Sequence, residues 1–225
     1  MIAAMMVAAI SANAQNEVGQ LTLKPTVGLN IASMTKGEDT KVRPGFVAGV
    51  EAEYGVSENF GIQFGLLYSQ QGVKGKNTGF GELDFDENDN LVGGWAFSGD
   101  ATLKLDYINI PILAQYYPVK GLALKAGIQP GFNVLKKVKL DGTLSQAGVQ
   151  GGNTRTVNDS YKINEGVKGF QFAIPVGVSY EYANFVFDAR YNIYLTKALK
   201  DSDSRHSVFG FTLGYKFALY EKLLV

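Results

Sequence analysis

The sequence predicts an all-β fold: an antiparallel, up-and-down transmembrane β-barrel of about eight strands. The first observation is a two-residue repeat, in which apolar residues alternate with polar or small ones, as in residues 22–31. This repeat is typical of a strand with one apolar face. The second is spacing, since strands of about ten residues are separated alternately by short and long connections. The third is the gathering of aromatic residues at strand ends, where a membrane interface would lie.

Alternation and turn signals together place the strands in chain order. They are expected at residues 21–32, 45–56, 59–71, 103–117, 121–134, 168–181, 185–196 and 206–218. Three connections are tight, at residues 56–58, 118–120 and 182–184. The other four are long, at residues 33–44, 72–102, 135–167 and 197–205. This asymmetry predicts periplasmic termini and turns, with long loops outside the cell.

Two features of the strands require irregular pairing. Proline removes a ladder hydrogen bond, and a closed barrel has no edge, so bulges or bends are expected at the prolines inside strands. These are Pro25, Pro111, Pro130 and Pro175. The fourth strand also changes parity, because Leu103 and Ile108 belong to opposite faces. A bulge near Asp106 and Tyr107 would reconcile the two halves.

Aromatic side chains define two expected girdles, where an amphipathic ring contacts both lipid and water. The periplasmic girdle comprises Tyr54, Phe60, Tyr116, Tyr117, Tyr180, Tyr182 and Phe185. The candidates for the outer girdle are Tyr68, Tyr191 and Tyr194. Ordinary core aromatics are the alternative interpretation.

The 225 residues suffice for one barrel domain, and 21 basic against 21 acidic side chains leave no net charge to recruit nucleic acid. Cysteine is absent, which excludes disulfides, thiolate metal sites and a lipid-modified cysteine in this sequence. Residues 2–10 are apolar or small and lead to Ala12-Asn13-Ala14, which predicts a signal peptide at residues 1–14, cleaved after Ala14. The barrel domain is then residues 15–225. A short buried helix is the alternative for the first segment.

The polar face of the strands defines the expected lumen. The polar core residues are Lys24, Glu51, Glu53, Gln63, Lys125, Gln129, Asp188, Arg190, Asn192 and Lys216. Eight strands enclose an interior only just wide enough for side chains. Charges of both signs should therefore pair and fill the lumen, and a selective pore is the alternative.

Two polar segments are candidate sites. Residues 81–94 alternate acidic and amide side chains as a calcium loop does, but the sixth position is Asp89 rather than glycine and the twelfth is Trp95 rather than glutamate, which favours a solvated loop. The single histidine, His206, lies among Asp and Ser residues in what reads as a solvated turn. Catalysis there would need a positioned nucleophile and an orienting acid. No catalytic, cofactor or metal residue is predicted.

Several segments resemble the PorT-type outer-membrane β-barrel proteins of Bacteroidetes over essentially the whole mature chain. The segments are Ala12-Asn13-Ala14-Gln15, Thr26-Val27-Gly28-Leu29-Asn30, Tyr107-Ile108-Asn109-Ile110-Pro111, Ala126-Gly127-Ile128-Gln129-Pro130-Gly131, Asp188-Ala189-Arg190-Tyr191 and Gly214-Tyr215-Lys216-Phe217. The resemblance implies a barrel in the outer membrane of a Gram-negative bacterium. These motifs are strand and turn chemistry, so the secretion role of the founding member is not carried over on fold alone.

The leading functional hypothesis is a small, non-enzymatic outer-membrane barrel with a structural, adhesive or envelope-machinery accessory role. Its expected partners are outer-membrane lipid and other envelope proteins that contact the extracellular loops, without nucleic acid. Three alternatives stay open: porin-like transport of small solutes, a soluble lipocalin-like carrier whose apolar face points inward, and an outer-membrane acyl-chain enzyme.

Overall fold

The computed structural model describes residues 18–35, 40–148, 153–163, 166–199 and 203–220. The predicted signal peptide lies outside the described residues. Within the described ranges, no helix is long and apolar enough to cross a membrane.

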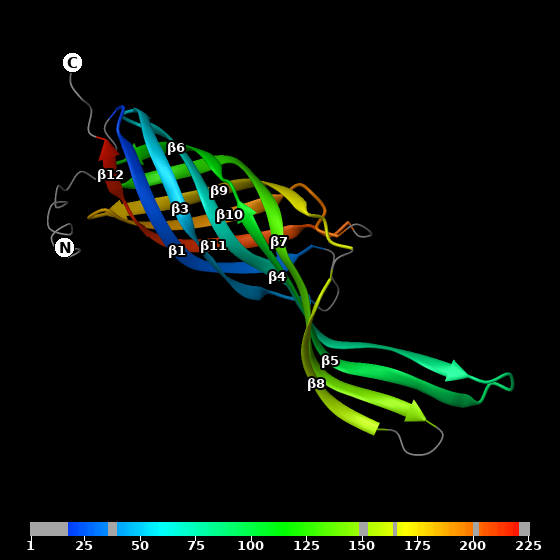
Figure 1. Cartoon of the computed structure of the whole chain (residues 1–225). Helices are drawn as coiled ribbons and strands as arrows, with labels where there is room; N and C mark the ends of the chain where they lie inside the picture. The colour runs from blue at the N-terminus through cyan, green and yellow to red at the C-terminus, as the bar shows by residue number, and fades with distance from the viewer. Residues whose placement is uncertain (1–17, 36–39, 149–152, 164–165, 200–202, 221–225) are drawn as a thin grey trace.

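Antiparallel strands form a closed ring with eight strand positions, each called a stave because some positions contain two labelled strands (Figure 1). The strands are β1 (Leu21–Met34), β2 (Thr40–Lys41), β3 (Arg43–Ser57), β4 (Phe60–Phe85), β5 (Leu91–Asn109), β6 (Ile112–Val119), β7 (Leu122–Gly148), β8 (Asn153–Lys162), β9 (Phe170–Tyr182), β10 (Phe185–Tyr194), β11 (His206–Tyr215) and β12 (Phe217–Tyr220). Consecutive staves pair with one another, and β1 closes the ring against β11 and β12. The stave between β4 and β7 consists of β6 and the end of β5.

Burial in this barrel is the reverse of that in a soluble protein. Along β1, the polar residues Lys24, Thr26 and Asn30 are buried, whereas Leu29 is 64% exposed and Val27 is 50% exposed. The same pattern holds around the ring, so the apolar faces point outward. An outward apolar band with a polar interior is the arrangement required by a lipid surround. The predicted transmembrane barrel, with its inside and outside faces, is confirmed.

The predicted bulge in the fourth stave is confirmed, because the register between β5 and β7 shifts at Asp106/Tyr107. The expected bulges at three prolines are wrong. The register does not shift at Pro25 opposite Val50, at Pro130 or at Pro175, although the β7–β9 ladder is interrupted opposite Pro175. Proline lacks only the backbone N–H donor, and its carbonyl oxygen still accepts a hydrogen bond from the neighbouring strand. The Ile110 amide, for example, donates to the Pro130 carbonyl at 2.9 Å.

At Pro111 the stave is interrupted rather than bulged. β5 ends at Asn109 and β6 begins at Ile112, and the break falls between them. The carbonyl of Pro111 still accepts from the Gly65 amide at 3.0 Å, so the interruption keeps the ring closed.

The largest departure from expectation concerns two long connections. Residues 72–102 and 135–167 were expected as loops, but most of both segments is strand. β4, β5 and β7 extend past the barrel rim, and β8 pairs with the projecting part of β7, giving a four-stranded antiparallel sheet that projects from the end opposite the termini (Figure 1). β7 ends at Gly148, and residues 149–152 of this connection lie outside the described residues.

The aromatic girdle is largely as predicted, with two corrections. Six of the expected periplasmic rings are exposed on the outward face: Tyr54, Phe60, Tyr116, Tyr180, Tyr182 and Phe185. Tyr117 is buried instead, because it follows the outward Tyr116 and consecutive strand residues face opposite sides. Tyr194 is also buried, on the same inward parity as Arg190. Tyr68 and Tyr191 are half-buried.

Candidate functional site

The centre of the lumen contains a five-residue ion-pair network around Arg190 on β10. The Arg190 guanidinium lies 2.9 Å from a Glu51 oxygen and 2.9 Å from Asp188 Oδ2. Lys24 Nζ approaches the other Glu51 oxygen at 2.8 Å, and Lys125 Nζ lies 2.7 Å from Asp188 Oδ2. All five side chains are almost fully buried. Each carboxylate therefore contacts two cations, which compensates for the loss of water around the charges.

A second network lies nearer the periplasmic end. Lys216 Nζ contacts Glu181 at 2.6 Å and Glu53 at 3.2 Å. The Tyr117 hydroxyl donates to Glu53, and its oxygen also lies 3.2 Å from Gln115 Oε1. Two carboxylates thus share one ammonium group, and tyrosine supplies a further donor to Glu53.

The two networks together balance in charge and fill the lumen. The cations Lys24, Lys125, Arg190 and Lys216 match the anions Glu51, Glu53, Glu181 and Asp188. Of the predicted polar core, Gln63 accepts from Lys125 at 3.0 Å, and both Gln129 and Asn192 are buried. A cavity of about 30 Å³, which Gln129 and Asn192 help to line, lies beside Arg190. That volume holds a water or two.

Neutral polar groups occupy the lumen above these charges. Gln71 donates to the Tyr194 hydroxyl at 2.9 Å and to Ser69 at 3.1 Å. His206, expected in a solvated turn, is only 2% exposed, and its Nε2 lies 3.4 Å from the Tyr107 hydroxyl. The strand begins at His206 as expected, but the inward parity of this first residue places its ring between Tyr107 and Tyr194, so the solvated position was wrong.

An apolar cluster closes the outer mouth of the barrel. The buried members are Met34, Leu105, Tyr107, Val167 and Ala198. Residues 166–169 and 197–199 cross the mouth, joined by the bridge between Val167 and Leu199 and by the Lys168 amide donating to Ala198 at 3.0 Å. Lys136 Nζ donates to the Val167 carbonyl at 3.0 Å. The lumen is therefore covered at this end by packed apolar side chains.

The projecting sheet has one mainly apolar face, on which Glu82, Arg155 and Asp159 also lie, and one polar face, as the register of its strands shows. The apolar face continues the inward face of the barrel, and Phe97 and Val157 are buried on it. At its border Phe80, Trp95 and Tyr161 stay exposed, with Phe80 packed edge-on against Trp95 at 5.9 Å between ring centroids. A single sheet layer thus presents large apolar side chains outside the membrane.

The acidic segment at residues 81–94, which resembles a calcium loop in sequence, contains the tip of the hairpin between β4 and β5. Its order comes from Asp86, which accepts from the Asn88 and Asn90 amides at 2.8 Å each and from the Asn90 side chain at 3.1 Å. These bonds, those from Asn90 first, lower the pKa of Asp86 below its usual value. Hydrogen bonding within the tip therefore accounts for this carboxylate.

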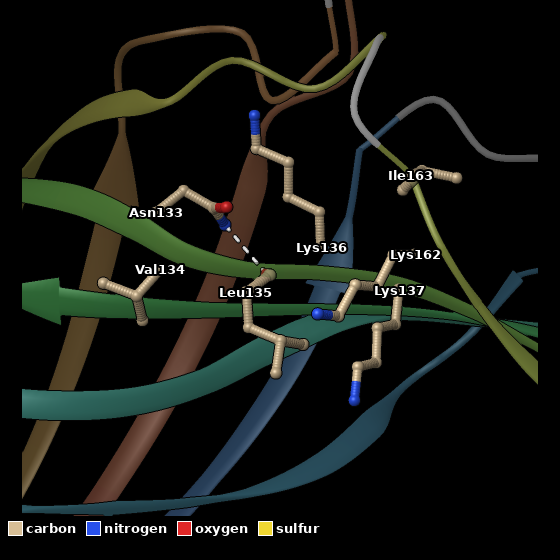
Figure 2. Close-up of a pocket in the computed structure, with 7 residues that line it drawn as sticks. All are labelled: Asn133, Val134, Leu135, Lys136, Lys137, Lys162 and Ile163. Atoms are coloured by element: carbon tan, nitrogen blue, oxygen red, sulfur yellow. Dashed lines mark hydrogen bonds between the residues drawn. The ribbon is translucent and has the colours of Figure 1, made fainter.

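A pocket of about 450 Å³ lies at the barrel rim, where β8 separates from β7 and β9 takes its place (Figure 2). The lining residues are Asn133, Val134, Leu135, Lys136, Lys137, Lys162 and Ile163. Lys137 and Lys162 extend to one side of the β7 ribbon, and Lys136 extends to the other. The pocket thus combines apolar side chains with ammonium groups.

Sequence reasoning missed two sets of residues. Glu181 belongs to the lumen, and continuing the alternation of β9 past Ser179 would have found it. The lysines of the projecting sheet were missed because residues 135–146 were read as loop, although Lys137 and Lys139 alternate there with Val138 and Leu140.

Comparison with protein families gives one match over most of the chain. A family model described as outer membrane protein beta-barrel domain matches residues 13–200. No curated protein matches the chain.

Solved structures of small outer-membrane barrels are similar to the chain at low identity. The attachment invasion locus protein Ail of Yersinia pestis is 13% identical, with a TM-score of 0.44, and the match covers 89% of this chain and 99% of Ail. Neisserial surface protein A is 14% identical, with a TM-score of 0.46 and coverage of 88% and 97%. OprG of Pseudomonas aeruginosa is 14% identical, with a TM-score of 0.39 and coverage of 91% and 98%.

Proposed function

The chain belongs to the family of outer membrane protein beta-barrel domains, and from this premise we propose that it is a non-enzymatic adhesive or accessory barrel that acts through its extracellular sheet. As a member, it is a small barrel of the outer membrane of a Gram-negative bacterium. Membership of the family gives the cellular location of the protein, whereas its role depends on its own surfaces.

The observation that carries the proposal is the closed lumen. Arg190 and its four partners fill the centre, and the cluster around Leu105 and Val167 covers the mouth. A solute would have to displace buried ion pairs as well as packed apolar side chains. Function is therefore assigned to the surface outside the bilayer, where the projecting sheet exposes Phe80 and Trp95.

A non-enzymatic role is supported by the position of the single histidine. His206 lies beneath the mouth cluster and contacts two tyrosine rings, so a substrate outside the cell cannot reach it. General acid–base work needs a group within hydrogen-bond reach of the substrate.

Conductance separates this proposal from porin-like transport. The refolded protein, inserted in planar bilayers, is expected to show no steady ion current. The control is an opened lumen, in which Arg190→Ala and Lys125→Ala remove two side chains from the central network. Steady current through the wild-type protein would assign transport to the lumen and refute the proposal.

Site-directed photocrosslinking in intact cells tests the role of the sheet. A photoreactive residue at Tyr161, on the border of the apolar face, is expected to give a discrete crosslinked product with an envelope protein. The matched control is Asn158, an exposed residue of the same strand on the polar face. Equal labelling from both positions, or none from Tyr161, would contradict the proposal.

The lipocalin-like alternative is wrong, because the apolar faces point outward and the lumen is polar and charged. Such a carrier needs an apolar cavity to hold its ligand. The acyl-chain enzyme alternative has no support beyond His206, whose burial argues against it.

We also propose a PorT-type relationship and a cleaved signal peptide at residues 1–14, with residues 15–225 as the barrel domain. The segments of the strands that resemble that family support the first, and Ala12-Asn13-Ala14 supports the second. Intact-mass measurement of the protein extracted from outer membranes is expected to place Gln15 at the mature N-terminus. A mass that retains residues 1–14 would refute cleavage after Ala14.

A further inference from the structure

A row of three lysines crosses the outward face of the projecting sheet just above the barrel rim. Lys104 on β5 lies directly opposite Lys137 on β7, and Lys137 lies directly opposite Lys162 on β8. Directly opposed residues of neighbouring strands point to the same face, and like charges in such pairs destabilise a sheet. The row thus costs the sheet stability unless an anion compensates for it.

Other lysines of the same face have that compensation. Lys74 lies 2.9 Å from Asp100, and Lys139 lies 3.3 Å from Asp141. Among the residues that the structure describes, no carboxylate lies within 4.0 Å of the ammonium groups of the row. Asp106, the next outward residue after Lys104, accepts instead from the Tyr68 hydroxyl.

The height of the row corresponds to the lipid headgroups. On β7 the outward residues Phe132 and Val134 are exposed to lipid, and Phe132 packs against Phe170 at 5.5 Å between ring centroids. Lys137 follows three residues after Val134 on the same strand. Lysines directly above an apolar band can extend their stems over it and place their charge among the headgroups.

The rim pocket gives the headgroup a place to bind. The Asn133 amide donates to Gly169 at 2.7 Å, and the Ile163 amide donates to Lys136 at 3.2 Å, so neighbouring strands hold β7 on either side of a gap at Val134 and Leu135. The pocket of about 450 Å³ fills this gap, with Lys137 and Lys162 at its outward side (Figure 2).

We propose that this lysine row, Lys104, Lys137 and Lys162, with the rim pocket, is a binding site for the phosphate groups of an outer-leaflet lipid headgroup. The ammonium groups donate charge-assisted hydrogen bonds to the phosphate oxygens, and Val134 and Leu135 contact the start of the acyl chains. The adjoining apolar wall favours a lipid over free phosphate, which has nothing to place against it.

Binding to a phosphorylated lipid tests the site. The full-length refolded protein in nonionic detergent is titrated with micelles that contain a diphosphorylated glycolipid of the lipid A type. Lys137→Gln with Lys162→Gln is expected to weaken binding about tenfold or more, equivalent to at least ~1.4 kcal/mol. The matched control, Lys74→Gln with Lys139→Gln, removes the same charge from the same face and is expected to change binding less than about twofold, because each of those lysines already has a carboxylate partner.

Three further arms decide the source of the phosphate. The same glycolipid without its phosphates is expected to bind at least about tenfold more weakly, since it lacks the charged groups. Lys137→Arg with Lys162→Arg is expected to retain binding, and heat-dependent gel mobility verifies that each variant is folded. Undiminished binding by the glutamine variant, or by the dephosphorylated lipid, would overturn the proposal. Full displacement by inorganic phosphate alone would identify free phosphate as the ligand and overturn it as well.

Discussion

At the scale of single residues, Arg190 connects the charged side chains of the lumen into one network. Its guanidinium contacts carboxylates from β3 and from its own strand, and those carboxylates in turn contact Lys24 and Lys125. A planar fork donates to two carboxylates at once, which an ammonium group on a flexible stem does less well. Arginine at this position therefore links opposite walls of the barrel.

Replacing Arg190 with alanine should cost about 3–5 kcal/mol of folding free energy, because Glu51 and Asp188 then stay buried with one cation each. Urea titration in lipid vesicles, followed by heat-dependent gel mobility of the closed barrel, measures the change. Lys197→Ala is the control, since its pair with Asp203 is about half exposed and should contribute about 0–1 kcal/mol. A loss at Arg190 no larger than that at Lys197 would contradict this account of the network.

Leu29→Arg tests the outward face at the level of one residue. Leu29 is 64% exposed on β1, and arginine at the bilayer midplane costs about 2–4 kcal/mol. The same titration on Thr156→Arg, at an exposed position of β8 outside the membrane, should show less than about 1 kcal/mol. Equal stability of the Leu29 variant and the wild type would mean that this face does not contact lipid.

At the scale of elements, the seam between β1 and β11 depends on a glycine. Gly28 lies opposite Thr212, and a Cβ added there would lie 1.9 Å from the Phe211 carbonyl oxygen. The obstacle is backbone rather than a movable side chain, so the two strands could not approach as closely. The last pairing that closes the ring thus requires a residue without a side chain.

Gly28→Ala is therefore expected to destabilise the barrel by about 1–3 kcal/mol, the usual cost of overpacking. Gly169→Ala is the control, because nothing lies within 4 Å of its added Cβ. Refolding yield by heat-dependent gel mobility, with urea midpoints, reports both. Matching midpoints for the two variants would show that the seam can widen without cost.

Sequence patterns predicted the staves well, for a physical reason. In a membrane barrel, every strand separates lipid from a filled lumen, so residues such as Leu29 and Asn30 must alternate, and the bulge at Asp106 appears as a break in parity. The same constraint placed all the expected core residues on the inward face. Their pairing was beyond sequence, since Lys24 and Arg190 are brought together only by closure of the ring.

The projecting sheet was missed because its two-residue repeat is weaker. Outside the membrane, neither face needs to be uniformly apolar, and glycines such as Gly99 and Gly142 interrupt the pattern. Long extracellular segments of barrels were expected as loops, so Lys137 and Val138 were not read as opposite faces of a strand. His206 was misplaced for a different reason: the last strand was expected to begin at this residue, but its polar neighbours were read as a solvated turn and its inward parity was not applied.

At the scale of the whole molecule, the barrel and the projecting sheet have separate sources of stability. The barrel contains the lumen networks and the ring of backbone pairing, whereas the sheet beyond the rim is held by its own ladder between β4, β5, β7 and β8. Where the two parts meet, Val73 and Leu103 pack against the mouth cluster.

Replacing residues 76–100 and 140–158 with short turns should therefore leave a folded barrel. Heat-dependent gel mobility should be retained, because every member of the two charged networks lies outside the deleted segments. Photocrosslinking from Tyr161, which the shortened protein retains, should be lost because the deletion removes most of the apolar face, including Phe80 and Trp95. Failure of this shortened protein to fold would show that the sheet is part of the barrel's folding unit.

The length of the projecting strands separates the protein's two external surfaces electrostatically. Residues 72–85 of β4, at ~3.3 Å per residue, trace a contour of about 45 Å beyond the rim. The Debye length at physiological ionic strength is about 8 Å. The lysine row therefore lies within the field of anionic headgroups, while Trp95 near the tip lies several screening lengths away. Changing ionic strength should thus alter attraction at the base of the sheet and leave apolar contacts at its far end almost unaffected.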